Sequence, residues 1–480
     1  VSDALRRSSY TVDGVAELLG EVAVADLARG RASTARDALA GDRSSRATAV
    51  RLLLLGDDVA VDEVASMLPV EEAAPLLVAD GSVVRAGYDV APHADDSHDW
   101  WVVSDRTSRS GRPVRPDHVL GVGSASTTLA QLTVRRPVRT ALDIGTGCGV
   151  QALHLSRHAE SVAATDVVDR AVRLAATSFA LSGVEVELLA GDLVAPVADR
   201  EFDLVVCNPP FVVGPSPRYA YRDADWSRRS SGAPDGLSRR AVRSAAEVLA
   251  DGGVAQLLVN WLHVRGEDWR DRVASWVSDL GVDALLLERD AQEPGDYVDT
   301  WLADAGERGD EERAEEWRRW LVDREVEAVG FGWVVLRRGS SPHRVAVETL
   351  AHHVDQPLGE VIATWLDRLA WMRTATDAEL LGARLRAGDG VRLETTSAPH
   401  AGGWQPEAAR LVLTAGLRWS LECDDAVAAL VAGCDGSRPL GDLVTVLAAA
   451  TGVAADELAG PVCATVRGLV DRGVLEPADA

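Results

Sequence analysis

Residues 138–149 read Val-Arg-Thr-Ala-Leu-Asp-Ile-Gly-Thr-Gly-Cys-Gly, and this stretch decides the fold of the chain around it. Its apolar first part predicts a buried strand, and its three alternating glycines predict a turn into a helix that starts at Val150. Glycine lets the backbone approach a ligand that a Cβ atom would block, and the first amide groups of the helix face the same ligand. The segment therefore predicts a ligand-binding loop at the carboxyl end of a strand.

From about residue 119 to residue 340, apolar runs alternate with helical patterns, which indicates a parallel sheet with crossover helices. The predicted strands are residues 138–144, 161–165, 184–189, 202–207, 253–260, 283–288 and 332–337. We therefore predict an α/β fold in which residues 118–340 form a Rossmann-like domain with a seven-stranded sheet.

The segments on either side have different patterns. Residues 1–117 combine short helical stretches with a small hairpin and end in a linker rich in Arg, Ser, Pro and Gly, which predicts a mostly helical accessory domain compatible with a winged helix. Residues 341–480 predict an α+β accessory domain that is winged-helix-like from about residue 405. Its helices are expected at 357–372, 425–433, 439–451 and 455–470, and its strands at 391–396, 410–414 and 417–423.

Composition and cysteine usage narrow the class of protein. The 480 residues are 47% hydrophobic and 26% charged, which is typical of a globular chain. No apolar run approaches the roughly 18 residues that span a bilayer, and the first residues lack a signal peptide's apolar core. The five cysteines are scattered, without a Cys-x-x-Cys pair, which favours a reducing compartment. We expect a cytoplasmic protein without a membrane segment or a metal site.

The formal net charge of −25 argues against a nucleic-acid partner, but the charge is unevenly distributed. Residues 106–139 carry seven arginines against one aspartate, 7 − 1 = +6. Residues 218–243 carry seven arginines against three aspartates, 7 − 3 = +4. Positive charge is thus concentrated in two segments that flank the predicted ligand site.

A carboxylate follows the second predicted strand, where the ligand loop of the first strand would meet it. Asp166 lies 23 residues after Asp143, a position at which a carboxylate suits the two hydroxyls of a ribose. The alternative is that Asp166 only caps the next helix. Position 150 is valine where the dinucleotide fingerprint requires a third glycine, so the loop departs from that fingerprint.

Residues 202–211 read Phe-Asp-Leu-Val-Val-Cys-Asn-Pro-Pro-Phe, an apolar strand that ends in a rigid corner. The side-chain oxygen of Asn208 and the carbonyl of Pro209 can accept the two N–H bonds of a planar amine. Pro210 fixes the backbone, and Phe211 offers a face on which a flat group can stack. The alternative is an ordinary turn at the end of a strand.

The loop Asp143-x-Gly-x-Gly-x-Gly followed by Asn-Pro-Pro-Phe resembles the small-domain group of class I S-adenosylmethionine-dependent methyltransferases. The resemblance implies that S-adenosyl-L-methionine is the cofactor and that Asp192 receives its adenine amino group. Residues that the resemblance implies as cofactor contacts are Asp143, Gly145, Thr146, Gly147, Gly149, Asp166, Asp192, Leu193 and Asn208. Residues that it implies as the catalytic acceptor motif are Asn208, Pro209, Pro210 and Phe211.

The group includes release-factor glutamine methyltransferases and ribosomal RNA guanine and adenine amine methyltransferases, so the acceptor has to be chosen among them. Phe211 stands where the glutamine enzymes usually have tyrosine, and the basic flanks favour RNA. A mixture of cations and aromatics follows the motif, as in sites for flipped or single-stranded bases: Arg218, Tyr219, Tyr221, Arg222 and Trp226. These arginines could instead only neutralise the acidic body.

We therefore expect an N-methyltransferase acting on a planar amino or amide nitrogen, with an exocyclic base amine of ribosomal or other RNA as the favoured acceptor. One alternative is an N5-glutamine methyltransferase of a protein such as a release factor. Another is a binding or regulatory protein with a vestigial cofactor domain.

Overall fold

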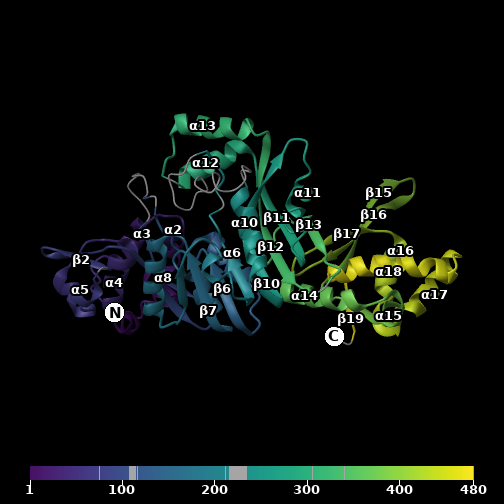
Figure 1. Ribbon diagram of the computed structural model, residues 1–480, viewed down its shortest axis with the longest axis horizontal. Helices are drawn as coiled ribbons and strands as arrows, with labels where there is room; N and C mark the ends of the chain where they lie inside the picture. Colours follow the sequence, from purple (N-terminus) through teal and green to yellow (C-terminus); the bar gives the residue numbers. More distant parts are fainter. Residues whose placement is uncertain are drawn as a thin grey trace. The chain divides into compact units, whose positions relative to one another are not determined.

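The computed structural model describes residues 1–74, 76–106, 115, 117–210, 212–215, 235–304, 306–339 and 341–478 (Figure 1). Contacts divide the chain into two compact units. One unit comprises residues 1–130 and 136–351, and the other comprises residues 131–135 and 352–480. The domain boundaries expected at 117/118 and 340/341 remain predictions. No helix in the described part of the chain has the length and apolar character that a membrane crossing requires.

An eight-stranded sheet forms the centre of the first unit, in the order β13-β11-β12-β10-β9-β6-β7-β8. The pairs are parallel except that β12 runs antiparallel to β10 and β11. Its strands are β6 (Val138–Ile144), β7 (Ala159–Asp166), β8 (Glu187–Ala190), β9 (Phe202–Cys207), β10 (Leu249–Val264), β11 (Val282–Gln292), β12 (Val326–Arg338) and β13 (Val345–Thr349).

The predicted Rossmann-like α/β fold is confirmed, and each of the seven predicted strands is present. The eighth strand, β13, was not predicted, because its five residues, Val-Ala-Val-Glu-Thr, are a short segment at the edge of the sheet in which no side chain is fully buried. It pairs in parallel with β11 and lies beyond residue 340, where the predicted domain ends.

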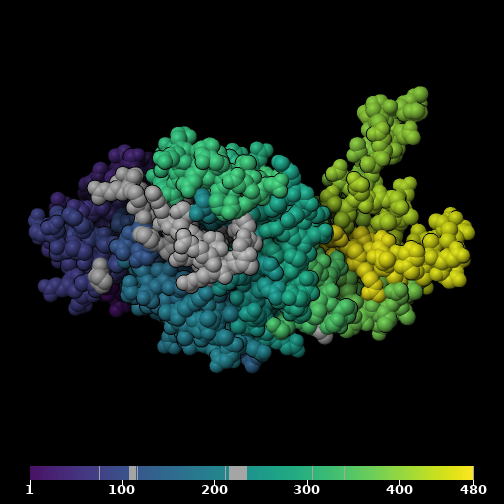
Figure 2. Space-filling view, turned by 45° about the horizontal axis from the view of Figure 1, so that its top comes forward, coloured from purple at the N-terminus to yellow at the C-terminus, as the bar shows by residue number. Residues whose placement is uncertain are grey.

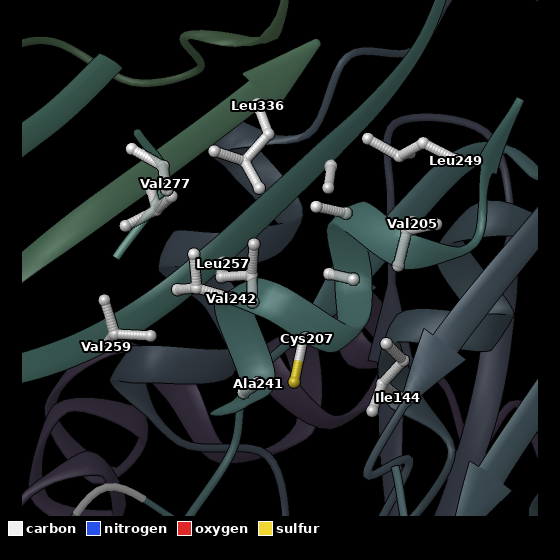
Figure 3. Packing of buried hydrophobic residues seen from close by; sticks show 14 of the residues in the cluster. Ile144, Val205, Cys207, Ala241, Val242, Leu249, Leu257, Val259, Val277 and Leu336 are labelled. Atoms are coloured by element: carbon white, nitrogen blue, oxygen red, sulfur yellow. The ribbon is translucent and has the colours of Figure 1, made fainter. Parts of the chain in front are cut away.

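Helices cover the sheet and bury its apolar side chains. They are α6 (Ser124–Leu132), α7 (Val150–Leu155), α8 (Asp169–Ser182), α10 (Gly236–Glu247), α11 (Trp269–Ala274), α12 (Pro294–Asp304) and α13 (Glu311–Val322). Figure 3 shows part of this core, where Ala241 and Val242 of α10 lie beside Cys207 of β9 and Leu257 of β10. Burial of such side chains is the main term that fixes the helix on the sheet.

The first unit begins with short helices and two small sheets. The helices are α1 (Ser2–Arg7), α2 (Val12–Ala28), α3 (Ser33–Ala38), α4 (Ser45–Ala49), the π-helix η1 (Val50–Leu55), α5 (Val61–Met67) and the 3-10 helix η2 (Glu71–Ala73). β1 (Val59–Ala60), β2 (Leu77–Asp80) and β3 (Val83–Ala86) form one sheet, and β4 (Asp89–Ala94) and β5 (Asp99–Ser104) form the other. The winged-helix assignment of this segment remains a prediction.

Strand β5 is attached to α8 of the large sheet by two hydrogen bonds. The backbone N–H of Trp101 donates to Ser182 Oγ at 3.1 Å, and that of Val103 donates to Ser178 Oγ at 2.8 Å. Serine hydroxyls thus satisfy the free N–H groups of an edge strand, which joins the N-terminal segment to the domain that follows.

The second unit consists of α14 (Gly359–Thr374), α15 (Asp377–Gly382), α16 (Asp425–Gly433), α17 (Leu440–Thr451) and α18 (Ala455–Asp471), with two small sheets. Its strands are β14 (Arg384–Ala387), β15 (Val391–His400), β16 (Gly403–Leu413), β17 (Ser420–Cys423), β18 (Asp435–Pro439) and β19 (Leu475–Pro477). The helices predicted from residue 357 onward are all present. Strands β15 and β16 form a long hairpin that projects from the rest of this unit (Figure 2).

Candidate active site

A cavity of about 300 Å³ lies at the carboxyl ends of β6, β7, β8 and β9. Crevices at this edge of an open α/β sheet are where such folds bind ligands, and the volume lies at the lower end of the usual range for small-molecule sites. The predicted site residues that line the cavity are Gly145, Thr146, Gly147, Asp166, Asp192, Leu193, Asn208, Pro209 and Pro210. The fold therefore brings together four segments that are separate in the sequence.

The glycine loop presents bare backbone to this cavity. Gly145 and Gly147 have positive φ angles of 71° and 56°, which favour glycine. Nothing lies within 4 Å of the position that a Cβ atom would occupy at either residue. The loop is therefore a cradle that a side chain would fill, as expected for backbone that closely approaches a ligand.

Gly149 and Asp143 support the loop from behind, and neither of them lines the cavity. A Cβ atom at Gly149 would lie 2.7 Å from the ring of Phe179 on α8, so glycine is needed there for packing. Asp143 Oδ2 accepts hydrogen bonds from Thr146 Oγ1 at 2.6 Å and from the Ala152 N–H at 3.2 Å. Burial raises the pKa of Asp143 to about 7, despite these two donors.

Asp166 connects the loop to the next strand. Its Oδ2 accepts from the Gly147 N–H at 2.9 Å, and its Oδ1 accepts from the Val168 N–H at 2.8 Å. Burial raises the pKa of this carboxyl, while the two N–H donors lower it. Each oxygen keeps a lone pair for a further donor, so the side chain can hold the loop and still receive the hydroxyls of a ligand.

Asp192 follows β8 and has one paired and one unpaired oxygen. Its Oδ2 accepts from Nη2 of Arg240 at 3.0 Å, whereas its Oδ1 is buried and has no hydrogen-bond partner within the described part of the chain. The next residue, Leu193, has a φ of 48°, in the left-handed region, and also lines the cavity. A buried oxygen without a donor at this place fits the amino group of an adenine ring.

Asn208 follows β9 and lines the same cavity as the glycine loop. Its Oδ1 is buried and has no hydrogen-bond partner among the residues that the structure describes. An unpaired buried acceptor costs about 1–3 kcal/mol, so native structures seldom keep one without a reason. Phe211, Arg218, Tyr219, Tyr221, Arg222 and Trp226, also predicted for this site, lie outside the described residues.

Segments that the sequence did not predict for this site also line the cavity, among them residues 118–123 and helix α12. Residues 118–121 and 123 line the cavity, and the segment 118–123 that contains them is called the strap below. Asp105 holds the strap, because its Oδ2 accepts from the Val119 N–H at 3.0 Å and its backbone N–H donates to Val119 O at 3.0 Å. Arg170 pairs with the same carboxylate. Two glycines at positions 121 and 123 were the one available signal for this strap.

The second segment is α12, which contributes Trp301 and Asp304 to the cavity wall. These residues lie more than 90 positions after Asn208, and the sequence analysis assigned them no role. No sequence signal connected them with the site, because the connection depends on how the chain returns to the sheet.

The two cysteines near the site are protonated thiols, and a protonated thiol is a poor nucleophile. Burial raises the pKa of Cys148 to about 12 and that of Cys207 well above its ordinary value. Among the described residues, no group of three or more His, Cys, Asp or Glu side chains is arranged to hold a metal ion.

Comparison with known proteins places the central segment in a family. Residues 120–223 match the methyltransferase small domain, which confirms the resemblance seen in the motifs. Residues 7–93 and 363–477 match two domains of unknown function, DUF7059 and DUF7782.

Individual relatives are named for different methylation targets. Ribosomal RNA small subunit methyltransferase C of Alcanivorax borkumensis is 33% identical over 119 residues, 25% of this chain and 31% of the relative. The release factor glutamine methyltransferase of Deinococcus radiodurans is 34% identical over 157 residues, 31% of this chain and 55% of the relative. The chain thus spans between about a third and about half of these curated relatives. A solved ribosomal protein L11 methylase of Lactobacillus delbrueckii subsp. bulgaricus is 16% identical, with a TM-score of 0.27 over 46% of this chain and 82% of that chain.

Proposed function

Because residues 120–223 form a methyltransferase small domain, we propose that the protein transfers a methyl group from S-adenosylmethionine to a planar amino or amide nitrogen. The observation that carries this proposal is the unpaired Oδ1 of Asn208 in the cavity that the glycine loop also lines. The glycine loop and an acceptor for an N–H group, Asn208 Oδ1, therefore line one cavity at the same edge of the sheet.

The residues on the cofactor side fit S-adenosylmethionine. The open backbone at Gly145 and Gly147 leaves room for the ligand chain, and the Asp166 carboxylate suits the ribose hydroxyls. The unpaired Oδ1 of Asp192 suits the adenine amino group. Asp143 and Gly149 have an indirect role in this proposal, since they hold the loop in shape. The cofactor, when bound, supplies a methyl group on a sulfonium, which is electrophilic at carbon.

The residues on the acceptor side would orient the nitrogen. Asn208 Oδ1 and the Pro209 carbonyl accept the two N–H bonds, which turns the nitrogen lone pair toward the methyl group. With S-adenosylmethionine bound, its sulfonium would give up the methyl group to this nitrogen and become the thioether of S-adenosylhomocysteine. The nitrogen would become cationic, still held by Asn208 Oδ1 and the Pro209 carbonyl, and one of its N–H protons would then leave to solvent. No side chain has to remove a proton beforehand, so orientation and electrostatic complementarity are the main contributions of the site.

For the acceptor we propose an exocyclic base amine of RNA. Support comes from the named target of the Alcanivorax relative and from the cations and aromatics that follow the acceptor motif in the sequence. A base amine is attached to a flat ring, which suits a site whose two acceptors, Asn208 Oδ1 and the Pro209 carbonyl, receive the N–H bonds of one planar nitrogen.

A glutamine side chain of a protein is the second candidate, and two observations favour it. The Deinococcus relative is named for such an acceptor. Several arginines of the two basic segments are paired with carboxylates, which reduces the positive charge available to phosphates: Arg106 with Asp89, Arg115 with Asp117, Arg139 with Asp203, Arg240 with Asp192 and Arg243 with Asp279.

The decisive experiment combines the purified protein with a labelled cofactor. The protein and tritiated S-adenosylmethionine are incubated with lysate from a strain that lacks the protein, label is counted relative to the same lysate without added protein, and parallel samples are treated with ribonuclease or protease. Label lost to ribonuclease supports RNA, and label lost to protease supports the glutamine candidate. RNA methylation should also weaken steeply with salt, because arginine–phosphate contacts release counterions. Absence of label in every fraction would contradict transferase activity and favour a binding protein.

The Asn208→Ala variant tests the chemistry itself. We expect methyl transfer to fall by about 100-fold or more, because the nitrogen loses its orienting acceptor, while affinity for S-adenosylhomocysteine changes by less than about threefold. Asn260→Ala is the matched control, since this asparagine is also buried but accepts from Ser238 Oγ at 3.1 Å. Equal losses of affinity and transfer in Asn208→Ala would contradict the assigned role.

A further inference from the structure

The backbone just after the acceptor motif is held by two side chains from a distant part of the chain. The N–H of Val213 donates to the hydroxyl of Tyr297 at 2.7 Å. The carbonyl of Val213 accepts from the indole Nε1 of Trp317 at 2.9 Å. Both side chains are buried, with 0% and 3% exposure, so these bonds are shielded from water.

Tyr297 lies on α12 and Trp317 on α13, the two helices inserted between β11 and β12. Helix α12 begins two residues after β11 ends, at the carboxyl edge of the sheet where the cavity opens. Figure 1 shows the two helices together beyond the ends of β11 and β12, and Figure 2 shows them in green on the surface of the first unit. They pack on Val212, Val213 and Leu262 in one apolar cluster.

Contact between α13 and the motif segment is close enough to restrict its position. A Cβ atom at Gly214 would lie 2.7 Å from Trp317 Cε2 and 2.9 Å from its Nε1. Trp317 is a rigid, buried ring, so it has little room to yield. Any side chain at position 214 would therefore displace either the indole or the backbone that it binds.

Helix α12 also contributes to the wall of the cavity. Trp301, one turn after Tyr297, lines the cavity together with Asn208 and Pro210, and its ring meets the Tyr297 ring at a centroid distance of 6.2 Å. One helix thus holds the backbone just after the acceptor motif and forms part of the wall of the cavity that Asn208 lines.

We infer that α12 and α13 form a positioning cap for the acceptor, with Tyr297 and Trp317 as its positioning residues; this inference rests on the proposed methyl transfer. Val213 lies five residues after Asn208, and two prolines in between restrict rotation of the backbone. Holding Val213 at both its polar groups therefore sets the direction of the Asn208 amide and of the Pro209 carbonyl.

Variants that remove single polar atoms test the cap. Tyr297→Phe deletes the acceptor for the Val213 N–H, and Trp317→Phe deletes the donor to its carbonyl. Gly214→Ala displaces the same segment without removing either partner. Tyr10→Phe is the matched control for tyrosine, because its buried hydroxyl donates to Val90 O at 2.8 Å, away from the site. Trp320→Phe is the control for tryptophan, since it lies on α13 and packs at the margin of the same cluster.

Three quantities are measured for each variant: the initial rate of tritium transfer into the lysate at saturating cofactor, the affinity for S-adenosylhomocysteine by calorimetry, and hydrogen exchange of peptides that contain Val213. We expect the three cap variants to lose about 10- to 100-fold in rate, because a misplacement of about 1 Å can cost about 100-fold. Affinity should change by less than about threefold, and exchange at Val213 should accelerate. Both control variants should keep the rate and the exchange of the native protein.

The outcomes separate this inference from the proposed function. Faster exchange at Val213 with an unchanged transfer rate would overturn the cap as a positioning device while leaving methyl transfer intact. Unchanged exchange in Tyr297→Phe would show that Val213 is not held by this residue, which also overturns the inference. Absence of transfer by the native protein would instead contradict the proposed function, and the exchange measurement would still decide whether Val213 is held.

Discussion

The carboxyl group of Asp143 provides a direct test of how the glycine loop is built. It is 1% exposed, and it accepts hydrogen bonds from the Thr146 hydroxyl and the Ala152 N–H. Burial raises its pKa to about 7 from the usual 3.8. The perturbation is Asp143→Asn, which keeps the shape and an acceptor oxygen but removes the ionisation.

The direction of the pH effect follows from which state holds the proton. Below about pH 4 the carboxyl is protonated in both the folded and the unfolded chain. In this range it contributes nothing to the pH dependence of the free energy of unfolding. Between about pH 4 and pH 7 the folded protein keeps a proton that the unfolded chain has lost. The free energy of unfolding therefore decreases as the pH rises, and above about pH 7 the full penalty is present.

The magnitude follows from the two pKa values. A rise from 3.8 to about 7 corresponds to a ceiling of about 4 kcal/mol, at about 1.4 kcal/mol per pKa unit. About 2.5 kcal/mol of this penalty develops between pH 5 and pH 8. Asp143→Asn carries no such penalty, so its stability relative to the native protein should increase by about that amount across the same range.

The assay is urea unfolding of both proteins from pH 5 to pH 8, followed by circular dichroism. Subtracting the two curves removes what other titrating groups contribute equally to both proteins. Curves that stay parallel over the whole range would show that Asp143 is not the buried acid described here. The reasoning would be refuted if the free energy of unfolding of Asp143→Asn, minus that of the native protein, decreased as the pH rises. That result would mean that the fold stabilises the Asp143 carboxylate.

Two further predictions concern the strap and the thiols. Asp105→Ala should lower the free energy of unfolding by about 2–3 kcal/mol, because it leaves the half-buried Arg170 without its carboxylate partner. The same variant should bind S-adenosylhomocysteine more weakly in calorimetry, because the strap is no longer held. Unchanged affinity would contradict a role of the strap in the site. At pH 8, iodoacetamide should label the half-exposed Cys423 well before Cys148, whose pKa burial raises to about 12. Mass spectrometry of the labelled peptides checks the order, and early labelling of Cys148 would show that the loop opens.

Local sequence predicted the secondary structure correctly in segments with a clear pattern of their own. The glycine loop, the strands that end at Asp166 and Cys207, and the helices after residue 424 follow from apolar periodicity and turn residues that act over a few positions. Strand β13 was missed because five residues at a sheet edge carry little periodicity, and its place is decided by pairing with β11. The small C-terminal sheet likewise includes β14, which lies before the predicted start at about residue 405.

Two residues that the sequence grouped with the cofactor loop do not line the cavity. From the sequence, Asp143 and Gly149 were grouped with the loop as contacts of the cofactor. In the structure their side-chain positions face Thr146 and Phe179 instead of the cavity. Sequence spacing shows that residues belong to one loop, but it does not show which of them face inward.

The sequence by itself determined the class of fold, the glycine loop after β6 and the Asn-Pro-Pro corner after β9, because each of these depends on backbone preferences within one short segment. Only the tertiary structure decided that Asp105 holds the strap and that Tyr297 and Trp317 hold Val213. These partners lie 14, 84 and 104 positions apart in the chain. Such contacts form when distant elements pack on one sheet, and no local pattern encodes which side chains will then meet.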